Sequence, residues 1–420
     1  MIDYSGLIQP EGIINILYKT LNHVDARLID HGLRVAYIVY RMLSPLNVHS
    51  DKELQNICFL SVLHDIGAYK TDEIDRMVQF ETKYVREHSI YGYLFVKYFS
   101  PIGYLAPAVL FHHTDWRQLK SCANMSQQNK EYAQIIRLAD RADIFNEYGK
   151  NADDFEKYLK DLSDGQFHLD VIELYQRAGI TFPLDLTSKS YGEFRNFIRN
   201  ADFSNEEIDR YLKMIISAID FRSYYTVTHT VTTSAISGSL AHFMGLEKSQ
   251  YDEIVCGAMV HDLGKIGIPV EILEFPGKLS PQAMGIMRTH VEITDEILGD
   301  HVSPVVRNIA VRHHEKLDGS GYPGRLHGHE LSTGERIVAA ADIVSALCGV
   351  RSYKTAYPRE KIIMIIRDMA FHGLIDSNIV DLIGENYDKI MHAAYKECTP
   401  VIEVYQMIQK EYDRLIQLDF

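Results

Sequence analysis

The sequence predicts an all-α protein built from two tandem domains. Through most of the chain, apolar residues recur at three- and four-residue steps, as in EEIDRYLKMIISAIDF (206–221), and this is the period of a helix. Alternating patterns with hairpin turns, which would indicate strands, are scarce. In addition, an ordered set of histidines and aspartates occurs once in each half, which indicates that one helical unit is repeated.

Domain boundaries follow from length and polarity. A chain of 420 residues exceeds the size at which a single hydrophobic core normally keeps growing. Residues 147–203 are more polar than the segments on either side, so we expect a first domain of residues 1–195 and a second of residues 196–420. Turns or helix ends are expected at Ser44-Pro45, Ser100-Pro101, Phe275-Pro276-Gly277, Ser280-Pro281, Ser303-Pro304 and Thr399-Pro400.

Composition and charge narrow the class of protein. With 46% hydrophobic and 24% charged residues, no secretory signal pattern and no apolar run of roughly 18 residues, the chain is expected in the cytoplasm, away from membranes. A net charge of −14 argues against binding DNA or RNA, although screening over about 8 Å still permits a small anionic ligand. The five scattered cysteines contain no CxxC pair and are expected to be reduced core thiols.

The repeat places the same residue types in the same order in both halves. The first half contains His31, His64-Asp65, His88, His112-His113 and Asp140, and the second contains His229, His261-Asp262, His290, His313-His314 and Asp342. Successive groups are separated by 33, 24, 24 and 28 residues in the first half and by 32, 29, 23 and 29 in the second. Random scatter would rarely produce this order twice.

Imidazole and carboxylate side chains in this number indicate an open metal centre. They suit Fe, Mn, Zn or Ni, and the lack of paired cysteines disfavours a structural zinc site. Seven ligands exceed the four of one tetrahedral ion, but with a bridging carboxylate they can hold two ions about 3.5–4 Å apart. We expect Asp262 to be the bridge. One ion then takes His229, His261, Asp262 and Asp342, and the other takes Asp262, His290, His313 and His314.

The second half resembles the HD-GYP family of the HD superfamily, and the first half resembles an HD domain without the GYP motif. The blocks that carry the resemblance are HDLGKIGIP (261–269), HHEKLDGSGYP (313–323), ERIVAAADIVSAL (335–347) and RSYKTA (351–356). It implies two tandem helical HD domains and a phosphodiesterase that hydrolyses a bacterial cyclic dinucleotide to a linear dinucleotide or mononucleotides. Cyclic di-GMP is the usual substrate, and some relatives with tandem HD domains prefer 3′3′-cyclic GMP-AMP.

Roles for individual residues follow from this chemistry. Asp262 and Lys265 are the expected catalytic residues: metal ions lower the pKa of bound water to about 7, and Lys265 can neutralise or protonate the leaving 3′-oxygen. The resemblance implies Fe or Mn as the pair of ions, with Zn or Ni as alternatives. The resemblance implies Lys265, Lys316, Tyr322, Arg351 and Lys354 as the substrate-binding residues. The GYP loop is also a candidate contact for a protein partner.

Departures from the family pattern leave several points open. Tyr225 stands where many members have a Glu that holds a third metal, Ser345 replaces a common Asp, Lys316 replaces Arg and Ser352 replaces Pro, so we expect two metals and an open base preference. In the first half, Ala68 stands in place of Lys265, with Lys70 as an imperfect substitute. The first-half cluster is therefore a candidate second metal site, and its domain could be a hydrolase of other specificity, a metal-loaded regulator or a packing shell.

Two other functions remain open at this level. One is another HD phosphohydrolase that acts on a nucleotide or an alarmone, and the GYP block argues against it. The other is a receptor that binds the dinucleotide without cutting it, although a receptor would not need Lys265 or a metal-activated nucleophile. The sequence does not fix the metal, the final product or the oligomeric state, and a dimer is among the alternatives.

Overall fold

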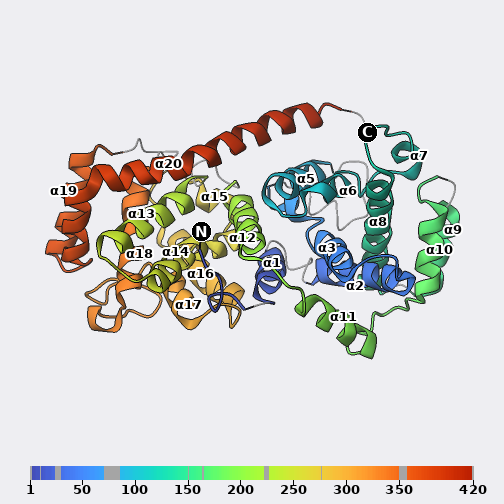
Figure 1. Cartoon of the computed structure of the whole chain (residues 1–420), viewed down its shortest axis with the longest axis horizontal. Coiled ribbons are helices and arrows are strands. Elements are labelled where there is room, and N and C mark those ends of the chain that lie inside the picture. The colour runs from blue at the N-terminus through green and yellow to red at the C-terminus, as the bar shows by residue number, and fades with distance from the viewer. Residues whose placement is uncertain are drawn as a thin grey trace. The chain divides into compact units, whose positions relative to one another are not determined.

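The computed structural model describes residues 2–9, 11–23, 30–70, 86–149, 151–162, 165–221, 227–275, 277–349 and 357–418, and its elements in these ranges are helices joined by loops (Figure 1). Within these ranges the β-structure is limited to isolated bridges, Ser5–Ile8, Ile8–Val302 and Asp318–His327. The all-α prediction is therefore confirmed. No described helix combines the length and hydropathy needed to cross a membrane.

The chain forms two compact units, and each unit consists of one long segment and one short terminal segment that is distant from it in the sequence. One unit consists of residues 1–16 and 215–407, and the other of residues 17–214 and 408–420. The boundaries fall inside α1 (Gly12–Asn22), α12 (Asn205–Asp220) and α20 (Ser377–Leu415). The sequence-based division between residues 195 and 196 is linear, so it does not anticipate this exchange of ends.

The unit of residues 17–214 and 408–420 is centred on five helices that Figure 1 shows close together. These are α2 (His31–Leu43), α3 (Asp51–Val62), α5 (Glu87–Phe99), α6 (Ala106–Leu110) and α8 (Gln127–Glu147). Short 3-10 turns lie between them: η2 (Ser44–Leu46), η3 (Ile66–Lys70) and η5 (Gly103–Leu105). Around this centre lie α7 (Trp116–Leu119), α9 (Ala152–Leu162), α10 (Leu169–Ala178) and α11 (Lys189–Arg199).

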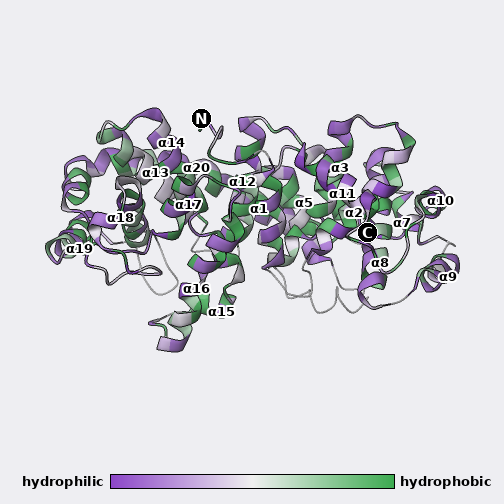
Figure 2. Cartoon of the chain, turned by 90° about the horizontal axis from the view of Figure 1, so that it is seen from below, coloured by the Kyte–Doolittle hydropathy of each residue, from purple (hydrophilic) through white to green (hydrophobic). Residues whose placement is uncertain are grey.

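The unit of residues 1–16 and 215–407 repeats this arrangement. Its central elements are α13 (His229–Phe243), α14 (Lys248–Val260), η6 (Leu263–Gly267), α16 (Pro281–Leu298), α17 (Pro304–Val311) and α18 (Thr333–Cys348). α15 (Val270–Leu273), η7 (Gly328–Glu330) and α19 (Arg359–Phe371) complete it. Apolar side chains of α13, α14, α18, α19 and α20 form its core, including Ile236, Ile254, Val338, Ile366 and Ile383. Figure 2 shows hydrophilic and hydrophobic residues along the helices, as expected when one face is buried.

The proline sites act in three different ways. Ser100 ends α5 as predicted, whereas Ser280 and Ser303 accept a backbone N–H at the start of α16 and α17, with proline at the first helical position. The expectation of a helix end at Thr399-Pro400 is wrong, because Pro400 lies inside α20. Burial of apolar residues such as Ala394 and Cys398 on this helix shows that tertiary packing sustains it there.

The cysteines are all free thiols, but they are not all in the core. Cys58, Cys256 and Cys398 are buried, whereas Cys122 and Cys348 are partly exposed. The expectation of core thiols is therefore wrong for these two residues. Cys122 lies in the loop just after the four-residue helix α7.

Candidate metal centres

All seven predicted ligands of the second half lie together in one cluster. His229 is the first residue of α13, His261 and Asp262 directly follow α14, His290 lies on α16, and Asp342 lies on α18. The adjacent His313 and His314 follow the end of α17. Six of these residues fall into two groups whose ligand atoms lie within 4.8 Å of one another: His229, His261 and Asp262 form the first, and His290, His313 and His314 form the second.

The Asp262 carboxylate lies between the two groups. Its Oδ2 atom is 3.3 Å from His229 Nε2 and 3.0 Å from His261 Nε2. Its Oδ1 atom is 3.5 Å from His290 Nε2 and 4.0 Å from His313 Nε2. One oxygen therefore faces each group, which is the arrangement that a bridging carboxylate needs.

Asp342 closes the cluster from α18. Its Oδ1 atom lies 3.0 Å from His229 Nε2 and 3.8 Å from His261 Nε2, while its Oδ2 atom lies 3.8 Å from His314 Nδ1. Burial acts to lower the pKa of His229, but its bonds to Asp262 and Asp342 outweigh this and raise the pKa to about 9. A positive charge is thus favoured at the position between these two carboxylates.

The local helix geometry fixes the tautomers of three imidazoles. Their Nδ1–H groups donate to the carbonyl three residues earlier: His261 to Ala258 at 2.7 Å, His290 to Met287 at 2.7 Å and His313 to Ala310 at 2.6 Å. Each Nε2 atom then carries a lone pair directed into the cluster. Such backbone bonds are the usual way in which a metal-binding histidine is oriented.

Two of these lone pairs face each other at close range. The Nε2 atoms of His290 and His313 are 3.4 Å apart, yet both are acceptors, so they cannot form a hydrogen bond with one another. His261 Nε2 and Asp262 Oδ1 are likewise buried without a hydrogen-bond partner. One cation in each group would satisfy these atoms. The residues therefore fit the divalent ions that the sequence predicts.

A glycine allows the turn after Asp262 to approach α16. A Cβ atom on Gly264 would lie 1.8 Å from the His290 carbonyl oxygen, so only glycine fits. Thr294 fastens the same contact, because its hydroxyl accepts from Gly264 N at 2.9 Å and donates to the His261 carbonyl at 3.1 Å. Gly67 occupies the equivalent place in the first half, where a Cβ atom would lie 1.9 Å from the His88 carbonyl oxygen.

Two charged residues lie beside the cluster of the second half. Lys265 Nζ contacts Asp262 Oδ2, so the predicted lysine reaches the predicted bridge. Asp220, on α12, is buried, and its charge interacts with His229 and Lys265; burial raises its pKa to about 7. The repeat does not mark Asp220, whose one signal in the sequence is an acidic residue at the end of an apolar helical stretch.

The GYP loop holds Tyr322 against the cluster. Glu315 is buried, and its carboxylate accepts from Gly324 N at 2.6 Å and from Leu326 N at 3.0 Å, which closes the loop. Tyr322 N donates to the His314 carbonyl at 3.2 Å, and the two rings lie 4.8 Å apart between centroids. Burial raises the pKa of Tyr322, and the carboxylates of Asp262 and Asp342 raise it further. The Tyr322 ring therefore lies beside His314 of the cluster.

The remaining predicted substrate residues are less fully defined. Lys316 lies at the start of the loop and is partly exposed. Arg351 and Lys354 lie outside the described residues, as do Tyr225 and Ser352. Their expected roles stay predictions.

The first half assembles its seven predicted ligands in the same way. His31, His64 and Asp140 form one group, and Asp65, His88, His112 and His113 form the other. Asp65 Oδ2 lies 3.3 Å from His64 Nε2 and 3.7 Å from His31 Nε2, while Oδ1 lies 3.5 Å from His88 Nε2 and 3.6 Å from His112 Nε2. His64 Nε2, Asp65 Oδ1 and Asp140 Oδ2 are buried without a hydrogen-bond partner.

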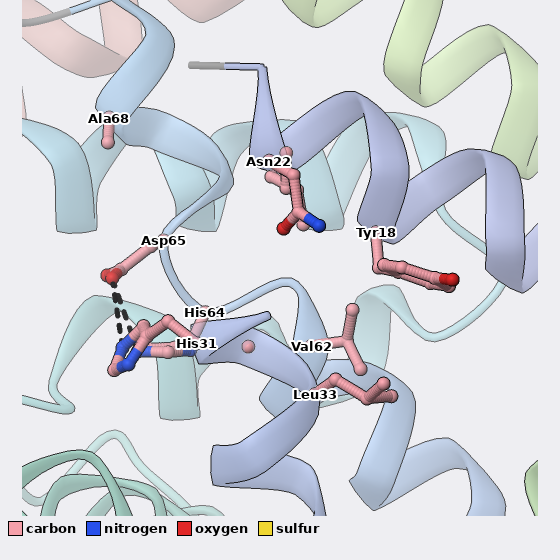
Figure 3. A pocket seen from close by; sticks show the side chains of 10 residues that line it. Tyr18, Asn22, His31, Leu33, Val62, His64, Asp65 and Ala68 are labelled. Atoms are coloured by element: carbon pink, nitrogen blue, oxygen red, sulfur yellow. Dashed lines mark ion pairs between the residues drawn. The ribbon is translucent and has the colours of Figure 1, made fainter. Parts of the chain in front are cut away.

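A pocket opens onto this first-half cluster (Figure 3). Tyr18, Leu33, Val62 and Ala68 line it together with His31, His64 and Asp65, and the figure shows Asp65 paired with both histidines. Ala68 forms part of the wall where Lys265 stands in the second half. The pocket therefore offers a histidine–carboxylate edge and an apolar wall, with Ala68 at the position that corresponds to Lys265 in the sequence of the second half. Nothing is described of the Lys70 side chain.

Known proteins resemble this chain in both halves. HD-domain family models match residues 28–144 and residues 213–379. The 3′3′-cGAMP-specific phosphodiesterase 1 of Vibrio cholerae is 28% identical over 88% of this chain and 89% of its own length. The cyclic di-GMP phosphodiesterase of Thermotoga maritima is 38% identical over 42% of this chain and 48% of its own length.

The fold has a solved counterpart as well. The crystal structure of a cyclic GMP-AMP-specific phosphodiesterase of V. cholerae, V-cGAP3, matches with a TM-score of 0.58 and 17% identity, over 91% of this chain and 98% of that one. At this identity the match supports the fold alone. Together with the two HD-domain matches and the GYP loop, the relatives decide the assignment. The chain belongs to the HD-GYP family of phosphodiesterases, with a second HD domain that lacks the GYP loop in its N-terminal half.

Proposed function

We propose that this protein is a metal-dependent phosphodiesterase that hydrolyses a bacterial cyclic dinucleotide at the cluster of the second half. The observation that carries the proposal is the Asp262 carboxylate, with one oxygen toward each histidine group and Lys265 in contact with it. His261 Nε2 and Asp262 Oδ1 have no hydrogen-bond partner among the described residues, which supports a pair of ions as the occupant. Histidine and carboxylate donors suit Fe or Mn, with Zn or Ni as alternatives.

The chain's own groups supply the positioning and the proton transfer. When bound, two ions lower the pKa of a water molecule and polarise the phosphoryl oxygens. His229, His261, Asp262, His290, His313, His314 and Asp342 hold them. In hydrolysis, water adds to phosphorus and the bond from phosphorus to the 3′-oxygen breaks. Lys265 Nζ is the group available to give a proton to that oxygen, and Tyr322, whose ring lies beside His314, is an expected contact for the substrate.

Of the two candidate substrates, we propose that the protein prefers 3′3′-cyclic GMP-AMP to cyclic di-GMP. The relative specific for that nucleotide aligns along both halves of the chain, whereas the cyclic di-GMP enzyme aligns with 42% of it. We further propose a cytoplasmic location, a protein partner at the GYP loop, and a metal-loaded first half that hydrolyses, regulates or supports packing. Two ions for each loaded cluster are expected.

A substrate panel tests the proposal. The purified chain, loaded with Mn²⁺ or Fe²⁺, is assayed on 3′3′-cyclic GMP-AMP, cyclic di-GMP, cyclic di-AMP and linear pGpG. The double variant His261→Ala/Asp262→Ala should lose at least a thousandfold in kcat, because removing ligands removes the nucleophile. The matched variant His64→Ala/Asp65→Ala should still cut the cyclic substrate.

The metal content of the same preparations provides the control. Each double variant should lose the ions of its own half and keep those of the other. If activity survives in His261→Ala/Asp262→Ala and disappears in His64→Ala/Asp65→Ala, the hydrolysis takes place in the first half and the proposal is wrong. Full metal loading of the wild type with every cyclic dinucleotide bound but left uncut would identify a receptor instead of an enzyme.

A further inference from the structure

An arginine outside the predicted site lies at its mouth. Arg288 is on α16, two residues before His290, and its guanidinium carbon is 4.8 Å from the centroid of the Tyr322 ring. At this distance a guanidinium and an aromatic face attract each other. Arg288 is exposed, so its side chain remains open to a ligand while the ring holds it in place.

The Tyr322 ring, over which the Arg288 guanidinium lies, is held in position by contacts of its own loop. Its backbone N–H donates to the His314 carbonyl, its ring lies 4.8 Å from the His314 ring, and Glu315 closes the loop behind it. Arg288 is therefore two contacts away from a proposed metal ligand. A ligand whose phosphate lies at the ions would have its remaining atoms beside Tyr322 and Arg288.

Within the described part of the chain, the charge of Arg288 is left without a neutralising carboxylate. Among the described residues, no carboxylate forms a salt bridge with its guanidinium. Arg359 provides a contrast within the same unit: it also lies over a tyrosine ring, that of Tyr387 at 5.3 Å, but it forms a salt bridge with Asp388 at 2.8 Å. An unneutralised guanidinium next to a site for a polyanion is a natural contact for phosphate oxygens.

The repeat supports a role specific to the second half. Arg86 occupies the equivalent position, two residues before His88, but its guanidinium donates to the Leu415 carbonyl at 2.9 Å. The first half has no GYP loop and no tyrosine in the place of Tyr322. Arg86 and Arg288 thus occupy equivalent positions in the repeat but contact different groups, a backbone carbonyl and an aromatic ring.

We propose that Arg288 is a specificity residue that binds the second, uncleaved phosphate of the cyclic dinucleotide, with Tyr322 as the platform that positions it. The inference rests on the proposed function, because it assumes a substrate with two phosphodiesters. One phosphodiester lies at the ions, and the other, across the ring of the dinucleotide, is the group within reach of the site's mouth. A substrate with one phosphodiester has no such group.

Steady-state kinetics with two kinds of substrate test this role. Arg288→Ala should raise KM for 3′3′-cyclic GMP-AMP roughly ten- to hundredfold, as loss of a charge-assisted hydrogen bond does, with kcat within a factor of about 3. Hydrolysis of bis(p-nitrophenyl) phosphate, which has a single phosphodiester, should be unchanged. Arg288→Lys should recover part of the loss, and Arg359→Ala should behave as the wild type.

Three results would overturn the assignment. The first is an equal loss on both kinds of substrate, which would indicate a structural role. The second is no loss on either. The third is a loss with cyclic di-GMP but none with cyclic di-AMP, which would mean that Arg288 contacts guanine and not phosphate.

A binding measurement separates this inference from the proposed function. The dissociation constant of a phosphorothioate cyclic dinucleotide, which resists hydrolysis, should rise by the same factor in Arg288→Ala. If the wild type binds this analogue but cuts no cyclic dinucleotide, the proposed hydrolase fails and the binding result alone decides the role of Arg288. If the wild type does not bind it, both proposals fail.

Discussion

His31 and His229 begin equivalent helices, but different side chains orient them. His31 Nδ1 lies 2.8 Å from the Asp143 carboxylate, which also accepts from Arg34 at 2.7 Å and 3.0 Å. His229 Nδ1 lies 3.1 Å from the Ser345 hydroxyl. A carboxylate makes the imidazole a stronger metal ligand than a hydroxyl does, because it favours positive charge on the ring. The two clusters should therefore hold metal with different strength.

The isosteric change Asp143→Asn should weaken metal binding in the first half about 10- to 100-fold, whereas the matched change Ser345→Ala should alter binding in the second half by less than a factor of about 10. Metal retained after dialysis against a graded chelator series measures both. Melting curves of the same proteins report any loss of fold caused by leaving Arg34 without its carboxylate. Equal metal loss in the two variants would contradict the expected difference.

For individual residues, the sequence predicts those of the site that recur in both halves, but not those that occur only once. His229, Asp262 and Asp342 could be identified because each has a counterpart at a similar spacing in the first half. Arg288 and Asp220 could not, because their importance depends on which side chains face them after folding. A single acidic or basic residue on a helix looks like any solvated one.

The 3-10 turn after each His-Asp pair is the element on which the site depends. In the second half it follows His261 and Asp262 and packs on α16, so it sets the distance between Asp262 and His290. The HDxG order of residues in both halves is explained by this contact, since the glycine touches the carbonyl of the next histidine along the chain. The periodic pattern predicts the helices but not this turn, which carries no amphipathic signal.

Gly264→Ala should reduce metal content and activity by at least tenfold, because the added Cβ would lie 1.8 Å from the His290 carbonyl oxygen and must push the turn away from α16. Gly285→Ala is the matched control on α16, where nothing lies within 4 Å of the added atom, and it should leave both properties intact. It should also raise the melting temperature slightly, since alanine has the higher helix propensity. A fully loaded Gly264→Ala protein would show that the close contact is dispensable.

In the whole molecule, each contact unit is completed by a segment distant in sequence. Glu411 illustrates this in the unit of residues 17–214 and 408–420: its carboxylate accepts from Lys97 Nζ at 2.8 Å and from the Tyr98 hydroxyl at 2.7 Å. Tyr412 stacks on Tyr91 with a centroid distance of 4.3 Å. Hydrophobic periodicity predicts α20 but not where its last turns pack, because that depends on partners more than 300 residues away.

The Glu411 contacts give the stability of this unit a defined pH dependence. Burial acts to raise the pKa of Glu411, but the bonds from Lys97 and Tyr98 outweigh it and lower the pKa below its ordinary value. A carboxyl group whose pKa is lowered on folding stabilises the fold above its unfolded pKa, about 4.3, and this contribution is lost as the pH falls through the folded value.

Glu411→Gln should therefore lower the melting temperature by about 2–4 °C at pH 7, for a loss of roughly 1 kcal/mol, and by less at pH 4. Glu403→Gln, on an exposed part of the same helix, is the control and should have no effect at either pH. Thermal melts followed by circular dichroism at the two pH values provide the measurement. A difference that grows toward low pH would have the wrong sign.

The exchange of ends also sets an order of events during protein synthesis. The unit that starts at residue 17 cannot be finished when residue 214 leaves the ribosome, since it still lacks residues 408–420. At about 5–20 residues per second, the missing segment arrives roughly 10–40 s later. Until then the nascent chain must keep the α5 surface around Tyr91 and Lys97 uncovered, which makes this surface a natural target for chaperones.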